Sequence, residues 1–149
     1  MTSATSPFPQ TSYCRYFPPV DVAATVRILL VEDNEVFREA LELMLDLVPD
    51  LEVVGAVGDG RSAIAASAEL DPDVVLMDYR LPELDGVEST AAITACSRAA
   101  VVVLTATADE GELEALLEAG AVACLTKDSE LEEIVRTIRS ASPRGASLV

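Results

Sequence analysis

The stretch that decides the fold is VVLMDYRLPELDGVE, which runs from Val74 to Glu88. An apolar run that suits a buried strand leads directly to an acid, Asp78. A turn that contains Pro82 and Gly86 follows at once. A buried strand that ends in a carboxylate, with a constrained loop behind it, raises the question of which other groups the fold brings to the same place.

Strand-like and helix-like segments alternate on both sides of this stretch. Short apolar runs predict strands, and apolar residues at helical spacing predict helices. The predicted strands are 26–31, 51–57, 73–78, 100–105 and 121–126, and helices are predicted at about 34–48, 61–70, 85–97, 109–120 and from 129 onward. Continuous apolar strands that alternate with helices indicate an α/β fold, with a parallel sheet covered on both faces.

Several residues mark the expected helix ends. Asn34 is a candidate N-cap for the first helix, Asp109 starts the fourth helix and Gly120 ends it. Ser129 followed by Glu132 predicts a capping box for the last helix. The apolar positions that repeat at helical spacing in the first helix are Val36, Phe37, Ala40, Leu41, Met44, Leu45 and Val48.

The composition excludes several kinds of site. The formal net charge of −16 repels nucleic-acid phosphates and anionic membranes. The chain has no histidine, which removes His-based catalytic triads and His-ligated metal sites. Three widely spaced cysteines, Cys14, Cys96 and Cys124, favour reduced thiols and a cytoplasmic location over disulfides or zinc. No apolar run approaches the ~18 residues of a membrane span.

The first residues differ from the alternating part of the chain. Residues 1–25 place four prolines among serines and threonines, and we expect a disordered leader that is not a signal peptide. Tyr13, Tyr16 and Phe17 are the candidates in this leader for docking to another surface. Residues 26–141 form a single predicted domain.

Polar residues stand where the predicted strands end. Glu32 and Asp33 follow the first strand, Asp78 and Thr105 end the third and fourth, and Lys127 follows the fifth. Each has an ordinary explanation, since a strand-terminal Asp often forms a cap or turn and a loop lysine is usually solvated. Because the carboxyl ends of the strands in a doubly wound sheet share one ligand-binding edge, we expect all five to lie together.

The residue types in this set favour phosphoryl transfer assisted by a metal ion. Oxygen ligands without His or Cys favour Mg²⁺, which takes one or two carboxylates and keeps several waters. A carboxylate beside the metal can act as a nucleophile and form an acyl phosphate. Mg²⁺ and Lys127 would neutralise the transferring group, and Thr105 can donate a hydrogen bond to its oxygens.

Four motifs resemble the signatures of the receiver domain of two-component response regulators. They are EDN at 32–34, VVLMDYRLPELDG at 74–86, LTAT at 104–107 and CLTKD at 124–128. The resemblance runs from about Val26 to Ala141. It implies a flavodoxin-like doubly wound (βα)5 fold, with a five-stranded parallel sheet in the order 2-1-3-4-5.

The resemblance also implies a role for each site residue. Asp78 is the expected phosphoacceptor for a sensor histidine kinase, Thr105 the switch hydroxyl and Lys127 the phosphoryl-binding lysine. The implied ligands of Mg²⁺ are Glu32, Asp33, Asp78 and the backbone carbonyl of Arg80. Phosphotransfer to the domain itself and autodephosphorylation are the only reactions expected.

Three positions depart from the family pattern. Glu32 stands where many members have Asp. Its longer side chain can still hold a metal-bound water, so we expect metal binding to be modified and not lost. Asp128 replaces the proline that commonly follows the lysine, a form that resembles the subgroup with a helix-turn-helix DNA-binding output domain. Cys124 replaces the aromatic residue that moves on activation, so the usual coupling from Thr105 to an aromatic ring is not expected here.

We expect this receiver to be part of a longer protein that carries the output domain. Residues 142–149, SPRGASLV, resemble the linker that follows the receiver in DNA-binding members, although a stand-alone tail is the other possibility. We expect homodimerisation on activation, and contact with DNA only through an output domain absent from this chain. The alternatives are a docking-only receiver and an Asp-nucleophile phosphohydrolase, whose usual second acid is replaced by Arg80.

Overall fold

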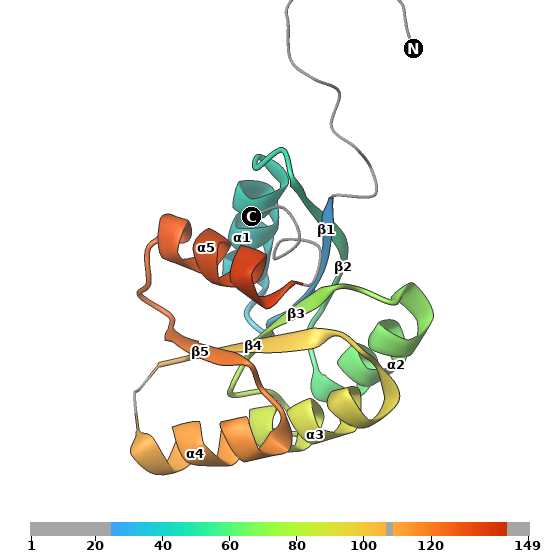
Figure 1. Cartoon of the computed structure of the whole chain (residues 1–149), viewed down its shortest axis with the longest axis vertical. Coiled ribbons are helices and arrows are strands. Elements are labelled where there is room, and N and C mark those ends of the chain that lie inside the picture. Colours follow the sequence, from blue (N-terminus) through green and yellow to red (C-terminus); the bar gives the residue numbers. More distant parts are fainter. Residues whose placement is uncertain (1–24, 107–108, 143–149) are drawn as a thin grey trace, which may run out of the picture.

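Five strands and five helices alternate along the chain. The structure is a computed structural model that describes residues 25–106 and 109–142. The elements are β1 (Val26–Val31), α1 (Glu35–Asp46), β2 (Leu51–Val57), α2 (Gly60–Leu70), β3 (Val74–Asp78), α3 (Gly86–Cys96), β4 (Ala100–Thr105), α4 (Glu110–Ala119), β5 (Ala123–Thr126) and α5 (Leu131–Ala141) (Figure 1). The predicted leader and tail lie outside the described residues, apart from Thr25 and Ser142.

The strands form one parallel sheet in the order β2-β1-β3-β4-β5, which confirms the predicted flavodoxin-like α/β fold. Helices α1 and α5 cover one face, and α2, α3 and α4 cover the other (Figure 1). Successive strand residues point to opposite faces. Leu30 therefore joins the core under α1 and α5, whereas Leu29 joins the core under the other three helices.

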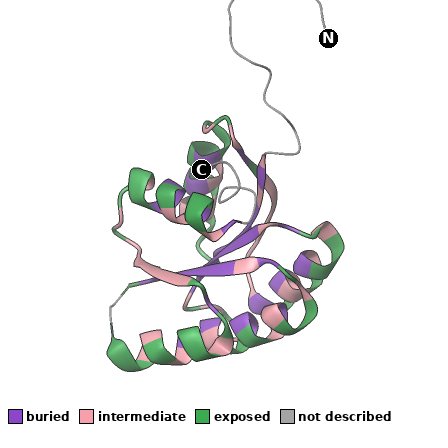
Figure 2. Ribbon diagram, viewed as in Figure 1, coloured by how far each residue is buried: buried purple, intermediate pink, exposed green. Residues whose placement is uncertain are grey.

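The central strand β3 is buried along its whole length (Figure 2). Its apolar residues from Val74 to Met77 have no exposed surface, since helices cover both faces of the sheet. A rigid buried strand therefore carries Asp78 to the carboxyl edge. Among the described residues, no helix combines the length and the apolar character that a membrane span requires.

Most helix ends follow the predicted signals. The Asn34 side chain accepts a hydrogen bond from Phe37 N, and Gly120 ends α4 with a φ of 117°. An unpredicted capping box, formed by Asp85 and Glu88, starts α3.

The capping box predicted for the last helix was wrong. Helix α5 begins at Leu131, and its N-cap is Glu130, which makes no side-chain cap hydrogen bond. The reason is a turn at the end of β5, in which the backbone N–H of Ser129 donates to the carbonyl of Thr126. The Ser129 hydroxyl lies 3.3 Å from the hydroxyl of Thr126 and is directed to this turn.

Candidate functional site

The loop behind Asp78 is held by backbone hydrogen bonds. Tyr79 N donates to the carbonyl of Leu104 on β4, and Gly86 N donates to the carbonyl of Tyr79, each at 2.8 Å. A Cβ atom at position 86 would lie 2.9 Å from the Cα and the carbonyl oxygen of Tyr79, so only glycine allows this approach. The loop therefore returns tightly to the end of β3 and keeps Asp78 at a fixed position.

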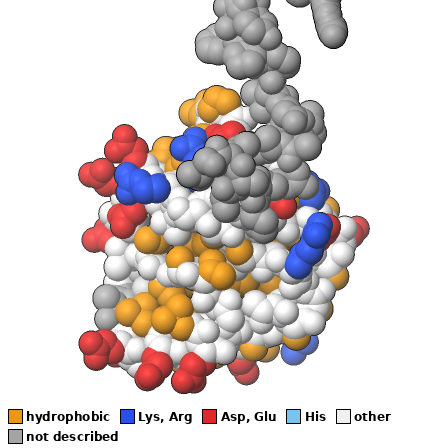
Figure 3. All heavy atoms as spheres, in the orientation of Figure 1, with side chains coloured by type: hydrophobic (Ala, Val, Ile, Leu, Met, Phe, Trp, Pro, Cys, Tyr) orange, Lys and Arg blue, Asp and Glu red, His pale blue; other side chains and the backbone are white. Residues whose placement is uncertain are grey.

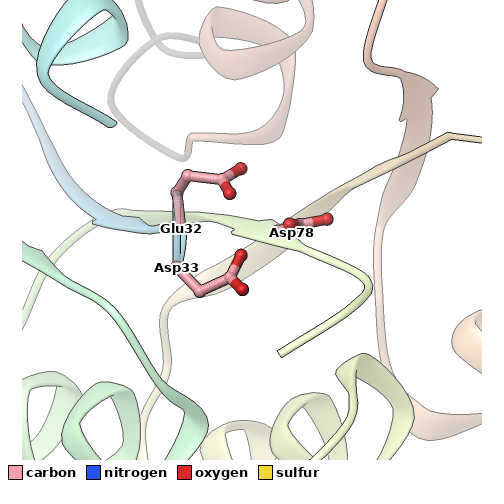
Figure 4. A group of neighbouring side chains, drawn as sticks. All are labelled: Glu32, Asp33 and Asp78. Carbon is pink, nitrogen blue, oxygen red and sulfur yellow. The ribbon is translucent and has the colours of Figure 1, made fainter. Parts of the chain in front are cut away.

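Three carboxylates converge at the carboxyl edge of the sheet. Glu32 and Asp33 follow β1, and Asp78 ends the neighbouring strand β3 (Figure 4). One oxygen from each of the three lies within 4.8 Å of the other two. Glu32 and Asp78 are buried, whereas Asp33 is exposed and leaves the cluster open to solvent.

Lys127 binds two of these acids. Its Nζ atom lies 2.9 Å from Asp78 Oδ2 and 3.1 Å from Glu32 Oε1. The lysine follows β5, and its backbone N–H donates to the carbonyl of Thr105 at 2.8 Å. One ammonium group therefore serves two buried carboxylates that come from two different strands.

The contact between Phe37 and Lys127 was not predicted from the sequence. The Lys127 Nζ atom lies 5.0 Å from the centre of the Phe37 ring, within the range of a cation–π interaction. Phe37 stands one helical turn after Asp33, so α1 places it at the rim of the cluster. A sequence signal for this contact is lacking, since it depends on how the lysine extends from β5.

The pKa of Glu32 is raised, mainly by burial. Burial raises its pKa from an ordinary 4.5 to about 7, against the hydrogen bond from Asn34 N and the contact with Lys127. The charge of Asp78 also raises the pKa of Glu32, but less than burial does. Burial is therefore the larger cause of the raised pKa of Glu32, and repulsion by Asp78 is the smaller one.

The pKa of Lys127 is set by its two acidic partners rather than by burial. Partial burial lowers its pKa, but the hydrogen bonds to Asp78 and Glu32 outweigh burial, and the pKa of Lys127 is raised overall. The ammonium group therefore stays charged at neutral pH. It is a permanent positive charge beside the predicted phosphoacceptor.

The remaining predicted residues surround the cluster. Thr105 is buried at the end of β4, the strand that pairs with β3. Arg80 lies in the loop after β3, where its backbone N–H donates to Asp78 Oδ1 at 3.3 Å. The metal-binding role of its carbonyl stays a prediction. Cys124 lies half-buried on β5 against the core under α2, α3 and α4, and burial raises the pKa of its thiol.

The donor set fits Mg²⁺. Three carboxylates without nitrogen or sulfur ligands match the preference of this ion, and the exposed Asp33 gives access to water. Glu32 Oε1 is fully buried and lies 3.1 Å from the Lys127 Nζ atom. A buried carboxylate requires positive charge nearby, and the single ammonium of Lys127 is divided between Glu32 and Asp78.

Comparison with known proteins identifies the class. Residues 28–139 match the response regulator receiver domain, and the chain belongs to this family. The transcriptional regulatory protein LiaR of Bacillus subtilis is 39% identical over 118 residues, which are 78% of this chain and 56% of LiaR. The chain thus spans about half the length of this relative.

Two solved structures support the same fold. The receiver domain of the response regulator NarL from Mycobacterium tuberculosis is 32% identical, with a TM-score of 0.75 over 78% of this chain and 94% of that one. The receiver domain of the sensor histidine kinase PA1611 from Pseudomonas aeruginosa is 36% identical, with a TM-score of 0.70 over 78% and 96%. The PA1611 structure has a magnesium ion coordinated in its active site cleft.

Proposed function

We propose that this receiver domain takes a phosphoryl group onto Asp78 from a sensor histidine kinase, in a reaction that requires Mg²⁺. The observation that carries the proposal is the position of Asp78 itself. It is a buried carboxylate at the end of a rigid strand, 2.9 Å from the Lys127 ammonium and grouped with two further acids. This chain has no histidine, so a phosphohistidine donor would lie outside it.

In the proposed reaction, a carboxylate oxygen of Asp78 attacks the phosphorus atom of a phosphohistidine. A P–O bond forms, the P–N bond breaks, and its electron pair leaves with the imidazole nitrogen. Lys127 then donates a hydrogen bond to a phosphoryl oxygen, and the Thr105 hydroxyl donates another. Bound Mg²⁺ would neutralise charge on the transferring group.

The residues that would hold Mg²⁺ are Glu32, Asp33, Asp78 and the carbonyl of Arg80. Lys127 compensates part of the charge of Glu32 and Asp78. Hydrolysis of the acyl phosphate would restore the carboxylate. The domain would thus act on itself and would not turn over a separate substrate.

We further propose that phosphorylation controls transcription in a longer protein. This is supported by LiaR, a transcriptional regulatory protein of which the chain spans 56%. Homodimerisation would carry the signal, and an output domain outside this chain would contact DNA, since a net charge of −16 disfavours direct binding. The free thiols of Cys96 and Cys124 are consistent with a cytoplasmic location.

With Cys124 in place of the usual aromatic residue, the signal from Thr105 would be transmitted in a different way. Cys124 is a small thiol that packs against the core, and it cannot leave and refill a pocket as a ring would. Any movement of Thr105 on phosphorylation would therefore be transmitted by the backbone of β4 and β5, which are paired at Thr105 and Thr126.

The test uses beryllofluoride, a phosphoryl analogue, together with Mg²⁺. We expect it to change the amide NMR signals around Asp78 and Lys127 in the wild type and to have no effect on Asp78→Asn. The matched control is Asp73→Asn, at the opposite end of the same strand, where the side chain accepts a hydrogen bond from Arg27 N. Equal responses of wild type and Asp78→Asn would refute the assignment.

A further inference from the structure

Helix α1 has an exposed apolar face in addition to its buried one. Four of the six exposed large hydrophobic side chains in the described part of the chain lie on this helix or at its C-cap: Val36, Leu43, Met44 and Leu47, at 79%, 69%, 38% and 82% exposure. The buried face consists mainly of Leu41 and Leu45. The apolar positions predicted for this helix therefore divide between two faces.

The spacing shows that the exposed residues form one stripe. Val36, Leu43 and Leu47 are seven and eleven residues apart, which are near-integral numbers of helical turns. Apolar side chains also gather where α1 meets β2, at the top of Figure 3. A continuous apolar stripe of this kind indicates a binding surface.

The segment before Val26 has the composition to cover this stripe. Four of the six aromatic residues of the chain lie in it: Phe8, Tyr13, Tyr16 and Phe17. The folded part has only Phe37 and Tyr79. Aromatic side chains gain most from burial, so a short segment that concentrates them is suited to docking.

This segment also joins the domain close to the C-terminal end of α1. Val26 N donates to the carbonyl of Asp50 at 2.9 Å, so the chain enters beside the turn that follows α1. Phe17 stands eight residues before Thr25, a reach of up to ~26 Å in extended chain. Helix α1 has 12 residues and is ~18 Å long, so the whole stripe is within reach.

The charges favour the leader over a second copy of the domain. The exposed stripe is flanked by acids of α1, namely Glu35, Glu39, Glu42 and Asp46. Two copies that met through this face would bring the same acids together. The leader has one acid, Asp21, and one base, Arg15, which stands between Tyr13 and Tyr16.

We propose that residues 13–17, Tyr-Cys-Arg-Tyr-Phe, dock on the α1 stripe of the same molecule. The tyrosine and phenylalanine rings cover Leu43, Met44 and Leu47, and Arg15 lies near the acids of the helix. This contact is independent of phosphoryl transfer at Asp78, so either proposal can fail alone.

The test compares amide NMR signals of the full chain with those of a Tyr13→Ser/Tyr16→Ser/Phe17→Ser variant. Unchanged amide signals of the central strand β3 would show that the domain stays folded in this variant. We expect shifts of the signals of α1, from Val36 to Leu47, and hydrogen exchange several-fold faster there. The matched control, Phe8→Ser, changes an aromatic residue outside the docking segment and leaves α1 unchanged.

A second variant pair identifies the surface. In a Leu43→Ser/Leu47→Ser background, the leader substitutions should change nothing, whereas in a Leu117→Ser background, which alters an exposed leucine of α4, they should have their full effect. Unchanged α1 signals in the triple leader variant would overturn the proposal. Shifts that disappear on dilution would also overturn it, because they would assign the surface to a second copy.

Discussion

Two charged clusters lie at opposite edges of the same sheet, and they differ in how fully their charges are balanced. At the amino edge, Asp50 forms a two-point ion pair with Arg139, at 2.9 and 2.7 Å. The hydrogen bond from Arg139 lowers the pKa of Asp50, and the pKa of Arg139 is raised. One acid meets one base, as in an ordinary structural ion pair.

At the carboxyl edge, three acids lie together, and one ammonium group contacts two of them. Lys127 contacts Glu32 and Asp78, while Asp33 has one oxygen in the same cluster. Burial raises the pKa of Glu32 to about 7. Both clusters contain an ion pair, so an ion pair alone does not mark a reactive site. A buried carboxylate with a perturbed pKa is the better indicator of one, and we propose that Mg²⁺ supplies the missing positive charge at this edge.

The largest expected difference comes from removing the base of each cluster. Lys127→Met leaves two buried acids without a cation and should lower the free energy of unfolding at pH 8 by about 2–4 kcal/mol. Arg139→Met removes a half-exposed partner and should lower it by less than about 1 kcal/mol. Urea unfolding without divalent ions measures both values, and equal losses would contradict the comparison.

The pH dependence of the two clusters should have opposite signs. Because folding raises the pKa of Glu32 from 4.5 to about 7, its stabilising contribution is complete below pH 4.5 and is lost as pH rises through about 7. The loss is about 3 kcal/mol for the metal-free protein. Glu32→Gln should lack this loss, so its stability relative to wild type should increase from pH 5 to pH 8.

The matched control for this titration is Asp50→Asn. The pKa of Asp50 is lowered in the folded state, so its contribution is present above 3.8 and is lost as pH falls through the folded value. Wild type should therefore exceed Asp50→Asn in stability at neutral pH, and the gap should close in acid. A pH profile of Glu32→Gln parallel to that of wild type would show that Glu32 is not the titrating group.

Mg²⁺ should stabilise the folded protein, and this stabilisation should depend only on the acids at the carboxyl edge. At a concentration 100-fold above its dissociation constant, Mg²⁺ should add about 2.7 kcal/mol to the free energy of unfolding. Asp33→Asn, at an exposed position, should remove most of this gain, and Asp50→Asn should keep it. Thermal unfolding with and without Mg²⁺ measures the gain. An equal gain in wild type and Asp33→Asn would place the ion elsewhere.

The smallest expected effect is that of Phe37. Phe37→Leu keeps an apolar side chain but removes the ring that lies 5.0 Å from Lys127 Nζ. A double-mutant cycle with Lys127→Met should give a coupling energy of about 0.5–1 kcal/mol. A coupling near zero would show that the ring serves only the core.

The fold could be predicted because its strands are continuous apolar runs that end in polar residues. The segment from Val74 to Asp78 shows this most clearly, and the same reasoning placed Lys127 at the edge that Asp78 occupies. Contacts that depend on side-chain direction could not be predicted. The contact between Phe37 and Lys127 depends on how α1 is oriented about its own axis against the sheet. The sequence pattern of α1 also does not show which of its apolar residues are buried, as Leu41 and Leu45 are, and which stay exposed. The Ser129 cap failed because a tight turn directs that hydroxyl to Thr126.

The most direct test of the central claim is to map the modification on the full chain. The protein is incubated with acetyl phosphate and Mg²⁺, and the modified peptide is located by mass spectrometry. We predict one added phosphoryl group, on Asp78, which is absent when the metal is chelated. A phosphoryl group on another residue, or one that forms equally well without a divalent ion, would contradict the account.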